Sequence, residues 1–204
     1  MGNHRVIYLV RHGALENPND IIYGRTIDLP LSSEGSEQIT KLSAKIFSID
    51  PVFMRIITSP LLRTRETAQI LSGAFEKSSI EIDDRLIETD CGKLDGAPLS
   101  LFLKQHIDAY QEPMRALYGV EAPQMIMERM YAVFISHLSN DSGPWCMVSH
   151  GDPLAFLMWK MTHFQESSIP SDADIKKWYL RTGECWRMLI NVDGSLQSFD
   201  HIIP

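Results

Sequence analysis

The sequence VIYLVRHG (Val6–Gly13) joins an apolar run directly to a guanidinium and an imidazole. Val6–Val10 contains only aliphatic and aromatic residues, and such a run predicts a buried β-strand. Arg11 and His12 follow it with no polar residue before them. Because neighbouring residues of a strand point to opposite faces, we expect strand pairing to end at about Val10, so that both side chains can turn toward one site.

Short apolar runs alternate with amphipathic segments along the rest of the chain. Strands are expected at 54–59, 79–83, 145–149 and 185–192, and a weak last strand is expected after the turn at 193–195. Helices are expected at 31–47, 59–75, 124–138 and 152–161. Strands that alternate with helices predict an α/β protein with a mostly parallel sheet.

The composition is that of an ordinary folded protein. Its 204 residues can bury a full core, 44% are hydrophobic, and no linker or composition shift divides the chain. We therefore expect a single domain over 1–204, with a lid-like insertion at about 97–123. The net charge of −7 argues against nucleic acid or an anionic membrane as a partner. It still allows a small anionic substrate, held by a local cluster of arginines.

The sequence predicts a cytoplasmic protein. No apolar run reaches membrane-spanning length, and the first apolar residues are interrupted too soon for a signal peptide. The three cysteines, Cys91, Cys146 and Cys185, are odd in number and far apart, which fits reduced thiols better than disulfides. Nothing in the sequence indicates the oligomeric state.

Charged or ionisable side chains follow several of the expected strands. They are Arg11 and His12 after the first strand, Arg63 one turn into the helix after 54–59, Glu88 after 79–83, and His150 after 145–149. In an open parallel sheet, ligands bind outside the carboxyl ends of the strands. Two arginines, two histidines and one glutamate are therefore expected at one edge of the sheet.

Each of these residues also has a purely structural interpretation. A histidine at a strand end is often only a hydrogen-bonded core residue, Arg63 could lie on an exposed helix face, and Glu88 could pair with Arg85. Taken together these interpretations are weak, because Arg11 and Arg63 would repel each other at one sheet edge unless an anion lay between them.

The residue types suit phosphoryl transfer. Two guanidiniums match the oxygens of a phosphate and stay charged at any working pH. One imidazole can act as a nucleophile, and a second, protonated imidazole would stabilise the transferring group. Glu88 can protonate a leaving alkoxide. Backbone N–H groups in the turns after Gly13 and Gly151 can also face the anion.

Five motifs occur in order over about three quarters of the chain: VRHG (10–13), YGR-x2-D-x-PLS-x2-G (23–35), SPLLRTRETA (59–68), L-x-E followed by two glycines (86–96), and VSHGDP (148–153). Together they resemble the histidine phosphatase superfamily, which has the phosphoglycerate mutase-like fold. The resemblance implies a three-layer αβα sandwich, with helices on both faces of a mostly parallel central sheet.

The resemblance also implies roles for individual residues. His12 corresponds to the nucleophile that becomes phosphohistidine, and Glu88 to the proton donor. The set that holds the phosphate comprises Arg11, Arg63 and His150. Further substrate contacts are expected from Asn17, Arg25 and Gly151. Neither a metal nor another cofactor is expected.

Two other functions remain open at this stage. A phosphoglycerate mutase shares the phosphohistidine step, but it uses paired arginines to hold the carboxylate of its substrate. Between 96 and 145 this chain has only Lys104, Arg115 and Arg129, all isolated, which favours hydrolysis of a small phosphorylated metabolite. A phosphate-binding module without catalysis is the third possibility, and the presence of His12 and Glu88 argues against it.

Overall fold

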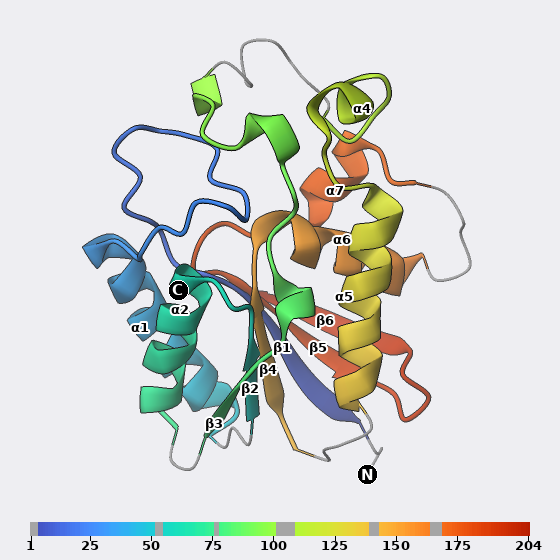
Figure 1. Ribbon diagram of the computed structural model, residues 1–204. Coiled ribbons are helices and arrows are strands. Elements are labelled where there is room, and N and C mark those ends of the chain that lie inside the picture. Colours follow the sequence, from blue (N-terminus) through green and yellow to red (C-terminus); the bar gives the residue numbers. More distant parts are fainter. Residues whose placement is uncertain (1–3, 52–54, 76–77, 101–108, 139–142, 164–168) are drawn as a thin grey trace.

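The computed structural model describes residues 4–51, 55–75, 78–100, 109–138, 143–163 and 169–204 (Figure 1). The strands are β1 (Arg5–Arg11), β2 (Arg55–Thr58), β3 (Ser79–Ile82), β4 (Trp145–Ser149), β5 (Cys185–Ile190) and β6 (Leu196–Ile202). The helices are α1 (Ser33–Ile49), α2 (Leu62–Gly73), α4 (Met114–Tyr118), α5 (Pro123–Leu138), α6 (Gly151–Thr162) and α7 (Asp172–Trp178). Two short 3-10 helices are η1 (Asp84–Leu86) and η2 (Gly92–Leu94).

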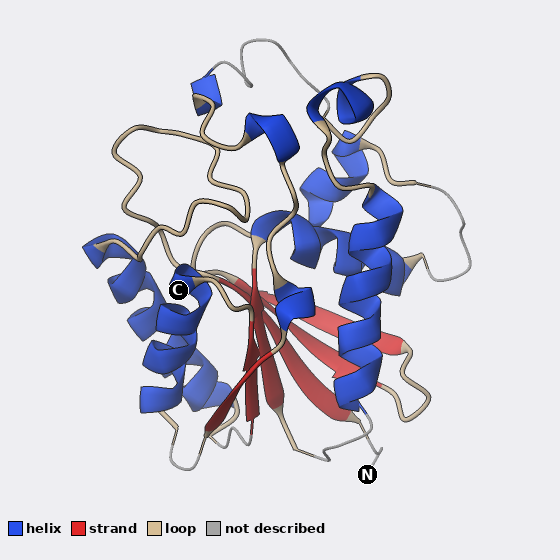
Figure 2. Ribbon diagram, in the orientation of Figure 1, coloured by secondary structure: helices blue, strands red, loops and turns tan. Residues whose placement is uncertain are grey.

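The described strands form one sheet in the order β3-β2-β4-β1-β5-β6. The first four strands in this order are parallel to one another, and β5 and β6 add two antiparallel pairings at the β1 side. Figure 2 shows helices on both sides of the sheet, with α1 and α2 on one face and α5 and α6 on the other. The predicted fold, a three-layer α/β sandwich around a mostly parallel sheet, is confirmed.

Alternation along β1 divides the core between the two helical layers. Ile7 and Leu9 pack in the cluster that α5 and α6 cover, and Tyr8 and Val10 pack in the cluster that α1 and α2 cover. All four are fully buried. Burial of each such side chain stabilises the fold by about 1.5–3 kcal/mol, so a change of register would be strongly unfavourable. The central strand therefore fixes where Arg11 and His12 emerge.

Helix α1 supports the loop that follows β1. Its N-cap Ser32 accepts a hydrogen bond from the N–H of Gly35 at 3.0 Å. A Cβ on Gly35 would lie 2.0 Å from the oxygen of Ala14, and a Cβ on Gly13 would lie 2.5 Å from the oxygen of Gly35. Both glycines are needed for this close contact between the loop backbone and the helix, which holds the turn after His12.

Strand pairing ends within one residue of the expected point, since pairing with β5 ends at Val10 and pairing with β4 continues to Arg11. Arg11 pairs with Ser149 of β4, and its N–H donates to the oxygen of Glu184 at 3.1 Å. The N–H of His12 donates to the oxygen of Ser149 at 3.2 Å, which continues the hydrogen bonding between β1 and β4 by one more residue. Pairing can continue because the long side chain of Arg11 reaches the site from within the strand.

The described residues of the segment 97–123 lie on the side of the molecule where β1 and β4 end (Figure 1). Its described part contains α4, and residues 101–108, including His106 and Lys104, lie outside the described ranges. None of the described helices combines the length and the apolar composition that a bilayer crossing requires.

Candidate active site

His12 is the residue that follows β1, and its ring is fully buried. Its Nδ1 lies 2.8 Å from the carbonyl oxygen of Gly13. A carbonyl can only accept, so Nδ1 carries the proton and Nε2 has the free lone pair. Among the described residues, Nε2 has no hydrogen-bond partner. Burial, together with the charges of Arg11 and Arg63, holds the pKa of His12 well below its ordinary value, so the ring is neutral.

Arg11 and Arg63 are both buried close enough to this imidazole for their charges to act on it. Arg11 donates through Nη1 to the oxygen of Leu180 at 2.7 Å, and its Nε has no partner among the described residues. Arg63 donates through Nη2 to the oxygen of Gly24 at 2.7 Å. The remaining donors of the two guanidiniums can bind an anion that approaches Nε2 of His12.

Two tyrosine rings border the guanidiniums. The guanidinium of Arg11 lies 4.8 Å from the ring centre of Tyr179, and that of Arg63 lies 4.9 Å from the ring centre of Tyr23. Such cation–π contacts stabilise the positive charges and hold the flat groups in place. Tyr23 belongs to one of the sequence motifs, whereas Tyr179 carries no signal that could have located it here.

His150 is buried at the end of β4, with its ring centre 5.3 Å from that of His12. Its Nδ1 accepts from Nε of Arg63 at 3.2 Å, so its proton is on Nε2, which lies 2.8 Å from the hydroxyl oxygen of Ser59. Burial and the adjacent guanidinium of Arg63 lower the pKa of His150 well below its ordinary value. In this arrangement the neutral form of His150 is therefore favoured, and the protonated second imidazole stays a prediction for the phosphoryl-transfer step.

Glu88 lies beside the two imidazoles and is 8% exposed. Its Oε1 accepts from the N–H of Thr89 at 2.9 Å, and its Oε2 lies 3.6 Å from Nδ1 of His150. Burial, followed by the negative charge of Asp152, raises the pKa of Glu88 to about 7. The alternative pairing with Arg85 does not occur, since Arg85 contacts Asp83 at 2.6 Å. A carboxyl with this pKa can both give and take a proton near neutral pH.

Asn17 and Arg25, two of the three residues expected to contact the substrate, bond to other parts of the protein. The side-chain amide of Asn17 is bonded to the backbone of Ile21 at both ends, at 3.0 and 3.2 Å. Arg25 donates to Glu121 and to the backbone oxygen of Glu88. Both side chains are thus engaged within the protein.

Gly151 begins α6, directly after His150. A Cβ on Gly151 would lie 2.6 Å from the ring of Tyr179, so the glycine lets this tyrosine cover the helix N-terminus.

The same cluster has the donor types of a metal site. His12, Glu88 and His150 offer one ligand atom each, all within 4.8 Å of one another. However, Nδ1 of His150 already accepts from Arg63, and two guanidiniums adjoin the cluster. The positive charges of these guanidiniums repel a cation and attract an anion. The cluster therefore fits a phosphoryl group better than a metal.

Comparison with known proteins identifies the family. The model of the histidine phosphatase superfamily (branch 1) matches residues 7–173. The chain belongs to this superfamily. The motif-based prediction of the family is thereby confirmed, together with the enzyme class that it implies. His12, Arg63, Glu88 and His150 all lie within the matched region.

Proteins of several different names resemble the chain. A Klebsiella pneumoniae protein named "Probable phosphoglycerate mutase GpmB" is 34% identical over 167 residues, covering 74% of this chain and 72% of its own length. Bacillus stearothermophilus YhfR has a TM-score of 0.77 at 22% identity, with 95% of this chain and 94% of that one covered. The mycobacterial glucosyl-3-phosphoglycerate phosphatase has a TM-score of 0.75 at 18% identity, with 98% and 97% covered. The two structures show the shared fold.

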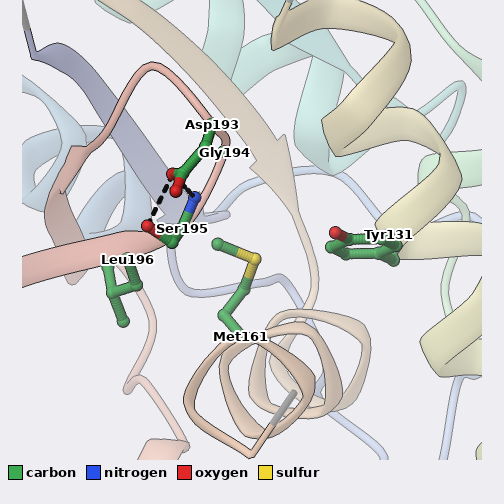
Figure 3. Close-up of a pocket in the computed structure, with 6 residues that line it drawn as sticks. All are labelled: Tyr131, Met161, Asp193, Gly194, Ser195 and Leu196. Atoms are coloured by element: carbon green, nitrogen blue, oxygen red, sulfur yellow. Dashed lines mark hydrogen bonds between the residues drawn. The ribbon is translucent and has the colours of Figure 1, made fainter. Parts of the chain in front are cut away.

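A cavity of about 290 Å³ lies away from this site (Figure 3). Tyr131 of α5, Met161 of α6 and the 193–196 turn line it. Because β5 runs antiparallel to β1, the turn after β5 lies at the edge of the sheet where β1 begins. The carboxylate of Asp193 accepts from the N–H and the hydroxyl of Ser195, at 2.9 and 2.6 Å. Its lining residues are not part of the phosphate cluster, which comprises Arg11, His12, Arg63 and His150.

Proposed function

We propose that the protein is a metal-independent phosphomonoester hydrolase that acts on a small phosphorylated metabolite through a phosphohistidine intermediate. The observation that carries this proposal is Nε2 of His12, which is buried, has no hydrogen-bond partner among the described residues, and is acted on by the charges of Arg11 and Arg63. An imidazole in this state is an activated nucleophile, and the two cations attract the group that it attacks.

The first step transfers the phosphoryl group to the enzyme. Nε2 of His12 attacks phosphorus in line, the P–O bond to the leaving alcohol breaks, and Glu88 donates its proton to the departing oxygen. Arg11 and Arg63 hold the equatorial oxygens. The bound dianion offsets the two guanidiniums, which raises the pKa of His150 again, so that its imidazole can take up a proton from solvent and stabilise the negative charge of the phosphoryl group.

The second step restores the enzyme. The ionised Glu88 removes a proton from a water molecule, the water oxygen attacks phosphorus, and the P–N bond to His12 breaks. Inorganic phosphate leaves, and Glu88 is again protonated for the next cycle.

Hydrolysis is favoured over the mutase reaction by the state of the described cations. A mutase needs free cations for the carboxylate of its substrate, but Arg115 pairs with Glu112, and Arg129 and Arg25 both pair with Glu121. Lys104 lies outside the described ranges. The alternative function is phosphoglycerate mutase-type transfer, as the name of the Klebsiella relative indicates for that protein.

We also propose that 97–123 shapes the substrate pocket within a single domain. Tyr110 of this segment donates its hydroxyl to the carboxylate of Asp152 at 2.7 Å, next to the start of α6. An acidic and aromatic wall of this kind favours a substrate whose alcohol carries no second negative charge. A cytoplasmic location is consistent with the free thiols of Cys91, Cys146 and Cys185.

The distinguishing experiment measures phosphate release from 4-nitrophenyl phosphate with and without excess EDTA. We expect steady turnover that EDTA does not change, and no conversion of 3-phosphoglycerate to its 2-isomer. Loss of turnover in EDTA that added Zn²⁺ or Mg²⁺ restores would contradict the metal-independent mechanism. Rapid isomerisation without phosphate release would establish the mutase instead.

A further inference from the structure

A buried carboxylate is joined to the segment that carries Glu88. Glu121 follows α4, and its side chain is 8% exposed. Its Oε2 accepts from Nη2 of Arg25 at 2.5 Å and from Nη2 of Arg129 at 3.1 Å, and its Oε1 accepts from Nε of Arg129 at 2.8 Å. The N–H of Asp90 also donates to Oε2, at 3.2 Å. One carboxylate therefore connects two guanidiniums and the backbone just after Glu88.

The same two guanidiniums donate to the backbone around Glu88. Arg25 donates through Nε to the oxygen of Glu88 itself at 3.1 Å. Arg129 donates through Nη1 to the oxygens of Arg85 and Ile87, each at 2.7 Å. Hydrogen bonds from a charged donor are stronger and more directional than neutral ones. Three backbone oxygens between 85 and 88 are thus fixed by side chains that Glu121 holds in place.

This support matters because regular structure does not hold Glu88. The 3-10 helix η1 ends at Leu86, and residues 87–91 belong to no helix or strand. Arg25 comes from the loop after β1 and Arg129 from α5, so without a shared anion their two charges would repel each other. The negative charge of Glu121 therefore neutralises both guanidiniums, so that they can lie together beside the backbone of Glu88 and donate to it.

We propose that Glu121, with Arg25 and Arg129, positions the carboxyl of Glu88 for proton donation to the leaving oxygen. This inference rests on the proposed function, in which Glu88 is the acid. It gives the 97–123 segment a part in catalysis, because Glu121 belongs to that segment. It also assigns Arg25, which the sequence motifs predicted near the substrate, to the support of the acid.

The test is the dependence of kcat/KM on the leaving group in a Glu121→Gln variant. An alkyl phosphate needs protonation of its leaving oxygen, whereas 2,4-dinitrophenyl phosphate needs almost none. We expect kcat/KM for the alkyl phosphate to fall by about 10–100-fold, the effect of a displacement of roughly 1 Å. For the dinitrophenyl ester we expect a loss of less than about threefold, because the phosphate site itself is unchanged.

Glu112→Gln is the matched control. Glu112 lies in the same segment and also pairs with an arginine, Arg115, but it makes no contact with 85–90 among the described interactions. Any change in kcat/KM in this variant should be the same for both substrates, because the backbone around Glu88 keeps all its donors. If Glu121→Gln fails to fold, Arg25→Gln serves instead, since it removes the donor to Glu88 and keeps the Arg129–Glu121 pair. It should show the same selective loss.

Equal losses on both substrates would overturn the inference, because a merely structural role lowers all rates together. Glu88→Gln, measured on the same two substrates, separates this outcome from failure of the proposed function. If Glu88→Gln is selective and Glu121→Gln is not, only the positioning role is wrong. If neither variant is selective, Glu88 is not the acid and both proposals fail.

Discussion

The His12→Ala variant should lose at least about 10⁴-fold in kcat on any phosphate ester, the loss typical of removing a nucleophile. The physical reason is that Nε2 is the only atom of the ring that can form the covalent bond, since Nδ1 is held by the oxygen of Gly13 at 2.8 Å. Phosphate release from 4-nitrophenyl phosphate measures the effect. The melting temperature of the variant shows whether the fold is kept.

His163→Ala is the control for this prediction. His163 is the C-cap residue that follows α6. Its ring stacks on Trp159 with ring centres 3.6 Å apart, and its described contacts do not include the phosphate cluster. It should retain wild-type turnover. A folded His12→Ala protein with substantial activity would mean that another group attacks phosphorus, and the covalent mechanism would be wrong.

Replacement of Glu88 by glutamine should reduce kcat/KM for alkyl phosphates by about 10²–10⁴-fold, the usual contribution of a general acid. Glutamine keeps the oxygen that accepts from the N–H of Thr89, so the backbone stays in place. Activated esters need little protonation, so 2,4-dinitrophenyl phosphate should be affected only a few-fold. Steady-state kinetics on the two esters measure the difference. Equal damage to both would show that Glu88 is not the acid.

The same residue sets the expected pH dependence. Glu88 must be protonated in the first step, and burial raises its pKa to about 7. As pH rises above this value the acid form is lost, so kcat/KM for alkyl phosphates should fall about tenfold per pH unit. The pKa of His12 is lowered by burial, so the nucleophile stays neutral over this range. The Glu88→Gln variant should lack the alkaline decline, and a decline that persists in it would assign that pKa to another group.

The phosphate cluster could be predicted from the sequence because strand ends have a fixed place in a parallel sheet. Arg11 is the last residue of β1, His12 and His150 directly follow β1 and β4, and Arg63 is the second residue of α2. The topology then brings β1, β2 and β4 together as neighbours with their carboxyl ends at one edge. The order of strands and helices along the sequence is therefore enough to predict that these four side chains lie near one another.

The charge states and the support of the acid could not be predicted in this way. His150 is neutral because burial and Arg63 lower its pKa, and burial depends on the whole fold. Arg25 is engaged by Glu121, a partner 96 residues away in the sequence. The side chain of Arg11 contacts Leu180 and Tyr179, which lie in a loop whose position the sequence does not indicate.

The most direct test of the mechanism is to trap the intermediate. The wild-type protein would be mixed with a ³²P-labelled phosphate ester, quenched within milliseconds in alkali, and digested for peptide mapping. The account predicts label that survives alkali, is lost in acid as expected for a P–N bond, and maps to His12. Label on any other residue, or rapid turnover with no protein-bound phosphate at any quench time, would contradict it.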